Sequence, residues 1–371
     1  MTKSVKPSTV SGRVAAPASK SVAQRAVIAA LLAEGASTLR NMSLCSDTQA
    51  AIGVAQTLGA QVAQQGSDCF ITSNFFANSV GAASLFCGES GLLTRMVAPV
   101  AALLPQEVEL SGHGSLASRP VDMVEAPLRD LGATATTTGG RLPLRVRGRL
   151  QGGSTRIDGS LSSQLLSGLL MALPLAPQCS SILVSNLKSK PYVDLTVELL
   201  KSFGVSVAHE RYEIFRINGR QRYAPCSYSV EGDWSGASCL LVAGAIAGSV
   251  AVENLNVRSA QADKEILSVL EQAGASVSVE RSGSGQCAVT ASQSALQPNS
   301  LRAFSFDATS CPDLFPAIVA LASCCNGVSA VKGVSRLAHK ESNRALTLQK
   351  EFGCLGIEIQ LRGDEMLITG G

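Results

Sequence analysis

Three charged side chains lie close together in the segment HKESNR near the end of the sequence. Lys340, Glu341 and Arg344 lie within five positions, and a helix would bring Lys340 and Arg344 onto one face. Like charges on one helical face repel by about 0.2–0.5 kcal/mol, so a bound anion would turn that cost into an attraction. Glu341, flanked by cations, is suited to stay ionised or to move a proton. The segment predicts an anion site that includes an acid–base group.

A second candidate anion site lies in the segment PASKSVAQR near the N-terminus. Pro17 to Lys20 are expected to leave a strand, and Ser21 is expected to begin an apolar helix. A serine at this point can cap free backbone amides, and those amides with Lys20 and Arg25 offer positive potential to a phosphate or carboxylate. The alternative is an ordinary helix cap beside two surface cations.

A third candidate is the glycine-rich segment CGESGLLTR. Gly88 and Gly91 let the backbone approach a ligand closely, and Arg95 is expected on the first turn of the helix that follows. Farther on, Arg119 precedes Pro120, a residue well suited to open a helix. A plain loop and a solvated arginine are the alternatives here.

Polar residues also stand where apolar helices are expected to begin. They are Ser162, Ser163 and Gln164, then Ser189, Lys190 and Tyr192 in the SKPY turn, and Asp313 after Pro312. Such groups are either helix caps or ligand contacts. Asp313 is an N-cap or a second carboxylate for acid–base chemistry.

These segments belong to an internal repeat. Five times an apolar, helix-like run ends at a glycine and is followed by two short strands, at Gly59, Gly132, Gly204, Gly274 and Gly356. The glycines are 73, 72, 70 and 82 residues apart, which is typical of a repeated architecture. The third repeat is the clearest, and its periodicity predicts the order βαβαββ. The fourth is expected to start near Cys226, after the polar stretch GRQRYAP.

One such unit cannot bury both faces of its sheet, so neighbouring units must share helices. The length of 371 residues suggests about two domains, and 46% hydrophobic residues with 16% charged indicate a soluble globular protein. The net charge of +3 is too small to favour nucleic acid as a partner. Any anion site must therefore be local.

The cysteines and the apolar runs of the sequence argue against disulfides, a metal site, a signal peptide and a membrane span. The 11 cysteines are scattered without zinc-like spacing, so we expect buried thiols in a reducing cytosol rather than disulfides or a metal site. Lys3 and Lys6 precede an apolar stretch from Ala26 to Ala33, but polar residues interrupt it upstream, so no signal peptide is expected. No run reaches the ~20 apolar residues that span a bilayer.

Taken together, the motifs resemble those of the 5-enolpyruvylshikimate-3-phosphate synthases. The resemblance rests on PASKSVAQR, SGLLTR, GSLSSQLLSGLLMALPLAP, SKPYVD, CPD and HKESNR, in this order over essentially the whole chain. It implies an α/β, two-lobed enolpyruvyl transferase fold, with lobes that are inside-out α/β barrels built from βαβαββ repeats. The first lobe would span residues 19–230, and the second would combine residues 1–18 with 231–371.

The resemblance also implies a reaction. The 5-hydroxyl of shikimate 3-phosphate would add to C2 of phosphoenolpyruvate while C3 is protonated, and the tetrahedral intermediate would then lose phosphate. It implies small-molecule substrates, no metal or organic cofactor, no nucleic-acid or membrane partner, a monomer if the chain is complete, and a cytoplasmic location. The two lobes of such enzymes close over their ligands, which excludes water.

Site residues are carried over by position. The catalytic set would be Asp313 as the base at the 5-hydroxyl, Glu341 as the proton donor to C3, and Lys20. Contacts to shikimate 3-phosphate would come from Lys20, Ser21, Arg25, Ser162, Ser163, Gln164, Ser189, Tyr192, Asp313 and Lys340. Contacts to phosphoenolpyruvate would come from Lys20, Gly91, Arg119, Gln164 and Arg344.

The sequence departs from the family pattern in two ways. Glu89 and Leu92 stand where asparagine and threonine are common, and Arg336 stands where asparagine is frequent. An acid beside a phosphate site is unfavourable unless it is paired. The sixth repeat of the family, with an Asp-His-Arg motif and a late lysine, has no counterpart in the sequence, so the second lobe is expected to be incomplete.

Two alternatives remain at this point. A UDP-N-acetylglucosamine enolpyruvyl transferase shares the fold, but that family usually has a reactive cysteine before the arginine, and SGHGSLASRP contains none. A non-catalytic, substrate-binding fragment of the synthase fold is the other alternative, and it would leave an apolar flank or a sheet edge exposed.

Overall fold

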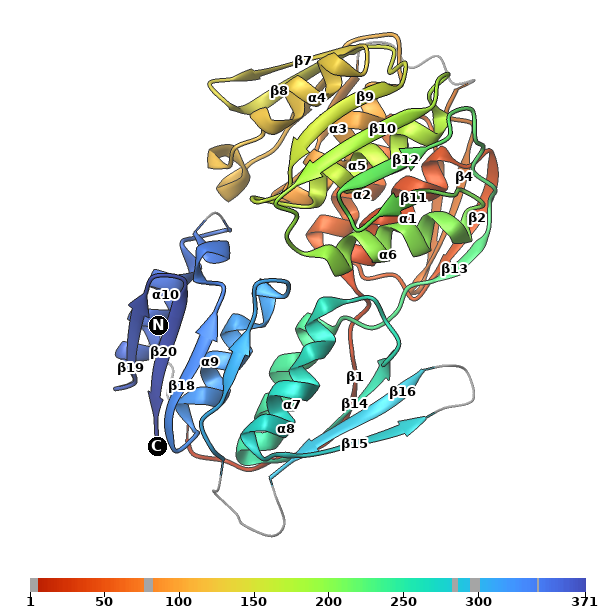
Figure 1. Cartoon of the computed structure of the whole chain (residues 1–371). Coiled ribbons are helices and arrows are strands. Elements are labelled where there is room, and N and C mark those ends of the chain that lie inside the picture. The colour runs from red at the N-terminus through yellow and green to blue at the C-terminus, as the bar shows by residue number, and fades with distance from the viewer. Residues whose placement is uncertain (1–5, 77–82, 282–285, 294–300, 339) are drawn as a thin grey trace. The chain divides into compact units, whose positions relative to one another are not determined.

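The computed structural model describes residues 6–76, 83–281, 286–293, 301–338 and 340–371 (Figure 1). The chain folds into two compact units, which are described one at a time. One unit comprises Ala18–Val230, and the other combines Met1–Pro17 with Glu231–Gly371. No helix in the described ranges is both long and apolar enough to cross a bilayer.

The unit Ala18–Val230 contains three four-stranded sheets. In spatial order they are β13 (Ser227–Ser229), β2 (Gly35–Arg40), β4 (Asp68–Ser73) and β3 (Gln61–Gln65); β5 (Ala83–Phe86), β6 (Val108–Ser111), β8 (Arg141–Gly148) and β7 (Ala133–Thr138); and β9 (Gly153–Asp158), β10 (Ser180–Ser185), β12 (Ile214–Ile217) and β11 (Ala208–Glu210). Each sheet combines a parallel pair with an antiparallel hairpin.

The second unit repeats this arrangement in two sheets. They are β1 (Val10–Ala15), β14 (Gly248–Leu255), β16 (Cys287–Ser292) and β15 (Ser276–Arg281); and β17 (Ser305–Asp307), β18 (Gly327–Lys332), β20 (Glu365–Gly370) and β19 (Glu358–Arg362). The predicted five repeats are thus confirmed as five sheets in the described part of the chain. Each of these sheets is open, so hydrogen bonds close none of them into a barrel.

Two strands are exchanged along the sequence, and this corrects the predicted start of the fourth repeat. The strand after Cys226 is β13, which pairs in parallel with β2 of the first repeat and places Ser227 opposite Thr38. The first strand of the fourth repeat is instead β1, where Val10 lies opposite Gly248. The edge of a sheet needs a partner for its N–H and C=O groups, and a distant segment serves as well as an adjacent one.

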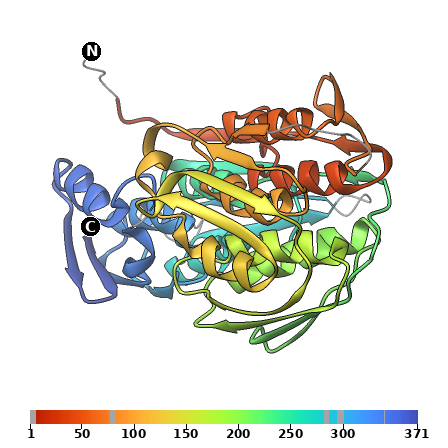
Figure 2. The same cartoon turned by 90° about the horizontal axis from the view of Figure 1, so that it is seen from above.

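Helices α1 (Lys20–Leu32), α3 (Gly91–Ala101) and α5 (Gln164–Ala172) are buried on nearly all sides. An apolar helix of this kind must be covered by other elements, and α3 packs along α5 and also touches α1. Helices α2 (Ser46–Thr57), α4 (Glu125–Asp130) and α6 (Lys190–Ser202) bury one face only. Helices of this unit, coloured red to green in Figure 2, run roughly parallel to one another. The N-termini of the helices in the unit Ala18–Val230 carry most of the candidate residues.

The second unit has two strongly apolar helices and two helices that bury one face. Helices α7 (Trp234–Ala247) and α9 (Phe315–Ser323) are strongly apolar and touch each other. Helices α8 (Ile266–Ala273) and α10 (Arg344–Gly353) bury one face. Short 3-10 turns complete the described structure: η1 (Gly114–Ser118), η2 (Asp122–Val124), η3 (Leu173–Leu175), η4 (Ala262–Glu265), η5 (Pro312–Leu314) and η6 (Val334–Leu337).

The glycines that mark the repeat all adopt left-handed backbone conformations. The φ angles are 95°, 93°, 77°, 87° and 84° at Gly59, Gly132, Gly204, Gly274 and Gly356. Each glycine ends a helix and turns the chain into a hairpin, a conformation that glycine adopts without steric cost. The repeat in the sequence is therefore a repeated helix C-terminus.

All 11 cysteines are free thiols, as expected. The expectation that they are buried holds for only some of them. Cys69, Cys87, Cys287, Cys311 and Cys325 are buried, whereas Cys179, Cys239, Cys324 and Cys354 are exposed. Those four lie on surfaces where packing does not require an apolar side chain.

Candidate active site

Helix α1 begins one residue earlier than the sequence suggested. Lys20 is its first residue, and Ser19, not Ser21, occupies the N-cap position. Neither serine hydroxyl caps the helix; instead Ser19 Oγ and Ser21 Oγ lie 3.3 Å apart. The first turn of α1 therefore offers backbone N–H groups without a side-chain cap among the described residues, beside the ammonium of Lys20.

Arg25, one turn further along α1, is a buried cation held by neutral oxygens. Its side chain donates to Thr196 Oγ1 at 2.9 Å, to the Ser21 carbonyl at 2.8 Å and to Ser167 Oγ at 3.4 Å. The residue is 1% exposed, and burial lowers its pKa to about 10. No carboxylate pairs with Arg25 in the described part of the chain. A buried charge of this kind is costly unless an anion joins it.

The contacts of Arg25 bring three helices together at one point. Ser167 lies on α5, Thr196 lies on α6, and their hydroxyls are 3.0 Å apart. Thr196 also donates to the Tyr192 carbonyl at 2.9 Å. Arg25 thus joins α1 to the interiors of α5 and α6.

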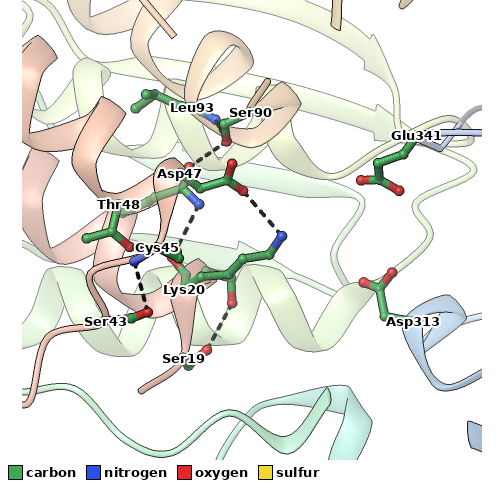
Figure 3. Close-up of polar contacts among 12 residues, drawn as sticks. Ser19, Lys20, Ser43, Cys45, Asp47, Thr48, Ser90, Leu93, Asp313 and Glu341 are labelled. Carbon is green, nitrogen blue, oxygen red and sulfur yellow. Dashed lines mark hydrogen bonds and ion pairs between the residues drawn. The ribbon is translucent and has the colours of Figure 1, made fainter. Parts of the chain in front are cut away.

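Lys20 forms an ion pair with Asp47, a residue that sequence reasoning missed. Lys20 Nζ lies 3.2 Å from Asp47 Oδ2 (Figure 3). The Asp47 side chain is 19% exposed and that of Lys20 is 58% exposed, so the carboxylate is the fixed partner. Its only signal in the sequence is an acid in the first turn of α2, where the helix dipole favours it.

We expect the ion pair with Asp47 to contribute only modestly to the position of Lys20. Asp47→Asn is expected to lower kcat/KM by roughly 2- to 5-fold, because half-exposed ion pairs contribute ~0.2–1 kcal/mol. Steady-state phosphate-release kinetics at low and high salt check this, and the effect should shrink at high salt. A loss of several hundred-fold would instead give Asp47 a direct part in the chemistry.

Gly91 begins α3 at a point where two guanidinium groups meet. A Cβ atom at Gly91 would lie 3.1 Å from Arg119 Nη1 and 3.2 Å from Arg95 Nη1. Arg119 and Arg95 are 9% and 7% exposed. Arg95 lies one turn into the helix rather than on its first turn. Two buried cations at a helix N-terminus form a site of strong positive potential.

The turn around Gly91 is fixed by Ser90, which accepts a hydrogen bond from Leu93 N at 3.2 Å and donates to Gln24 Oε1 at 2.7 Å. Glu89, one of the residues that depart from the family pattern, is exposed. Its carboxyl group lies against Gly114, which has a φ of 57° and no Cβ to block it. Pro120 opens no α-helix at once: the 3-10 turn η2 intervenes before α4.

The polar residues at the start of α5 are arranged by local hydrogen bonds. Ser162 Oγ accepts from Gln164 N at 3.0 Å, while Ser163 occupies the N-cap position without a capping bond from its side chain. Gln164 Oε1 accepts from Arg95 Nη1 at 2.7 Å. Gln164 and the two arginines therefore belong to one cluster.

Ser189 immediately precedes α6 and is 5% exposed. Its φ of 55° is unusual for a residue other than glycine. The Tyr192 amide donates to the Ser189 carbonyl at 3.1 Å. The SKPY turn thus presents Ser189 and Tyr192 at the helix start, as the sequence predicted.

In the unit containing Glu231–Gly371, Asp313 is the centre of a charged cluster. Asp313 Oδ1 lies 2.7 Å from Arg344 Nη1 and 3.3 Å from Lys340 Nζ, and Arg344 Nη2 lies 2.8 Å from Glu341 Oε2. Burial raises the pKa of Asp313, but the charges of Lys340 and Arg344 outweigh it and lower the pKa to about 2. Asp313 is therefore a carboxylate throughout the physiological pH range.

The predicted reason for the proximity of Lys340 and Arg344 is wrong. Helix α10 begins only at Arg344, where Asn343 Oδ1 caps Leu346 N at 3.3 Å. Lys340 lies in the bend before the helix, so the two residues do not share a helical face. Asp313, in the 3-10 turn η5 rather than at an N-cap, brings them together. His339 of the HKESNR segment lies outside the described residues.

The two units thus offer different chemistry. The first offers helix N-termini and buried cations that suit phosphate and carboxylate groups, and the second offers an ionised carboxylate among cations that suits proton transfer. Within the described ranges no group of three or more His, Cys, Asp or Glu side chains is arranged to hold a metal ion.

Comparisons with known proteins identify the family of the chain. The family model of EPSP synthase (3-phosphoshikimate 1-carboxyvinyltransferase) matches residues 5–371. The 3-phosphoshikimate 1-carboxyvinyltransferase of Methanothrix thermoacetophila is 37% identical over 374 residues, covering 100% of this chain and 86% of the relative. That of Clostridium botulinum strain Eklund 17B is 32% identical over 369 residues, covering 98% and 83%.

A solved EPSP synthase structure from Acinetobacter baumannii superposes with a TM-score of 0.82 at 24% identity, covering 98% of this chain and 83% of that one. This likeness confirms the predicted two-lobed α/β fold. The match of the family model over nearly the whole chain shows that the protein belongs to the EPSP synthase family.

Proposed function

We propose that the protein transfers the enolpyruvyl group of phosphoenolpyruvate to the 5-hydroxyl of shikimate 3-phosphate and releases phosphate. Family membership supports the reaction. The structural observation that carries it is Arg25, a buried guanidinium held only by neutral oxygens in the described residues. Such a cation needs an anionic ligand, and shikimate 3-phosphate supplies one.

Shikimate 3-phosphate is bound, in this proposal, by side chains at the starts of three helices. They are Lys20, Ser21 and Arg25 on α1, Ser162, Ser163 and Gln164 at α5, and Ser189 and Tyr192 at α6. The family resemblance adds Asp313 and Lys340 to this set. Hydroxyl and amide groups match the ring hydroxyls of the substrate, while the cations match its charges.

Phosphoenolpyruvate is bound by Lys20, Gly91, Arg119, Gln164 and Arg344. The guanidinium of Arg119 is buried near the N-terminus of α3, and both features favour a phosphate or carboxylate. A side chain at Gly91 would crowd Arg119 Nη1.

The reaction needs three proton movements, one at the 5-hydroxyl oxygen and two at C3. Asp313 accepts the proton of the 5-hydroxyl as its oxygen bonds to C2, and Glu341, with Lys20, delivers a proton to C3. The tetrahedral intermediate then loses a C3 proton while the C2–O bond to phosphate breaks, which gives the enol ether and inorganic phosphate. The buried cations stabilise the charge on the phosphate that leaves.

The substrate requirement tests this assignment. Phosphate release should need shikimate 3-phosphate and phosphoenolpyruvate together, and UDP-N-acetylglucosamine should not replace the former. Release that depends on UDP-N-acetylglucosamine would assign the chain to the related transferase. Calorimetric binding of shikimate 3-phosphate without any turnover would instead support a binding protein.

Gly91→Ala should selectively weaken the binding of phosphoenolpyruvate. A methyl group there must displace Arg95 and Arg119, and overpacking of this kind costs ~1–3 kcal/mol, so KM for phosphoenolpyruvate should rise roughly tenfold or more. KM for shikimate 3-phosphate should change less than about twofold. Equal changes in both KM values would contradict the placement of phosphoenolpyruvate at Gly91. Gly53→Ala is the matched control, because no atom lies within 4 Å of the added methyl group.

A further inference from the structure

Arg95 joins three segments of the unit Ala18–Val230 through one guanidinium group. Nη1 donates to Gln164 Oε1 at 2.7 Å, and Nη2 donates to the Pro120 carbonyl at 2.8 Å. Gln164 is the first residue of α5, and Pro120 directly follows Arg119. The side chain is 7% exposed, so these bonds are shielded from water.

The contact with Arg95 decides which way the Gln164 amide points. A guanidinium has only donors, so the Gln164 atom that faces Nη1 must be the oxygen. The amide nitrogen is then left as the free end of the group, and it donates to no acceptor within the described ranges. A glutamine without this contact could present either end to a ligand. Arg95 therefore makes Gln164 a donor.

The charge of Arg95 is not neutralised by a neighbouring acid. It forms no ion pair with a carboxylate in the described part of the chain, and its buried Nε has no hydrogen-bond partner there. Burial and the charge of Arg119 together lower the pKa of Arg95 to about 10. Two like charges meet above Gly91, at the N-terminus of the 11-residue helix α3. An anion in this place would relieve their repulsion.

We propose that Arg95 is a positioning residue for phosphoenolpyruvate: it locks the Gln164 amide with its N–H groups free for the anion, and it fixes the turn that carries Arg119. This inference rests on the proposed function, because it concerns the same phosphoenolpyruvate site. Arg95 acts through Gln164 and the Pro120 carbonyl rather than by direct contact with the reacting atoms.

A double-mutant cycle tests the coupling. Arg95→Met and Gln164→Ala should each lower kcat/KM for phosphoenolpyruvate by about 10- to 100-fold, since a charged hydrogen bond is lost in either case. The double variant should lose little more kcat/KM than the worse single variant, because both changes remove the same hydrogen bond between Arg95 and Gln164. KM for shikimate 3-phosphate should change less in Arg95→Met than in Gln164→Ala. Arg156→Met, which changes an exposed residue of strand β9, is the matched control and should behave as the unmodified protein.

Arg95→Lys separates positioning from charge. A single ammonium cannot hold both Gln164 and Pro120, so lysine should restore less than about a third of the lost activity. Full rescue by lysine, or multiplicative effects in the double variant, would overturn the inference. Circular dichroism and Tm of each variant show whether it folds, and the lysine variant keeps the test open if the methionine variant does not.

A binding experiment separates this inference from the proposed function. The side-chain ¹H–¹⁵N signals of Gln164 should shift on titration with phosphoenolpyruvate in the unmodified protein, and the shift should be lost in Arg95→Lys. If the protein releases no phosphate but the shift and its loss are seen, the proposed function fails and the inference stands. If phosphate release is normal and the Gln164 signals respond equally in both proteins, the inference fails alone.

Discussion

Asp313→Asn is expected to lower kcat by about 10²- to 10⁴-fold, which is the contribution typical of a general base. The Asp313 carboxylate can take a proton from a hydroxyl, whereas its two ion-pair partners, Lys340 and Arg344, are cationic donors. Asparagine keeps the shape and can still accept hydrogen bonds from both cations. Single-turnover phosphate release checks the result, and a loss below tenfold would contradict the role of Asp313 as base.

The low pKa of Asp313 predicts how the reaction rate and the stability depend on pH. Because the folded-state pKa of about 2 lies below the ordinary aspartate value, the carboxylate is present above about pH 4, and the pH–rate profile should show no limb from Asp313 there. The same shift stabilises the fold above the unfolded pKa, and this stability is lost as the pH falls towards 2. In Asp313→Asn that part of the acid dependence of Tm should disappear.

Arg25→Met is expected to remove binding of shikimate 3-phosphate without unfolding the protein. Loss of one partner of a buried charged contact costs ~2–5 kcal/mol in binding, so Kd should rise on the order of 30-fold to several thousand-fold. The apo protein should lose less than ~4 °C in Tm, because methionine removes an uncompensated buried charge and Ser167 and Thr196 still bond each other. Calorimetry measures Kd, and thermal unfolding measures Tm.

Controls for Arg25 separate charge from packing. Arg25→Lys keeps the charge but not the planar fork, so Kd should fall between those of the unmodified protein and Arg25→Met. Arg156→Met should leave both Kd and Tm unchanged. A variant Arg25→Met that binds shikimate 3-phosphate normally would show that the buried cation serves the fold and not the ligand.

The regular part of the fold could be predicted from the sequence because it rests on local rules. The repeat glycines mark left-handed helix ends, and periodicity gave the order of elements in the third repeat, from β9 to β12. Local pattern did not show the exchange of β1 and β13 between repeats, because strand pairing at a sheet edge leaves none. Only the family resemblance implied it, by assigning residues 1–18 to the second lobe and residues 19–230 to the first.

The candidate site divides in the same way. Residues at helix starts, such as Lys20 and Gly91, could be found because a cation or a glycine at a helix N-terminus has a local meaning. The partners Asp47 and Arg95 act across 27 and 69 positions of sequence, and such contacts are set by packing alone. The prediction that Lys340 and Arg344 share a helical face is wrong, because Asn343 caps the helix and Lys340 lies before that cap.

The central claim concerns which bond to the phosphate breaks. With phosphoenolpyruvate that carries ¹³C at C2 and ¹⁸O in the C–O–P bridge, NMR of the reaction with shikimate 3-phosphate follows both atoms. We expect ¹³C in an enol ether on the 5-hydroxyl and ¹⁸O in the released phosphate, because the tetrahedral intermediate breaks its C–O bond. Labelled pyruvate that retains ¹⁸O, with no ether formed, would show simple hydrolysis and contradict the account.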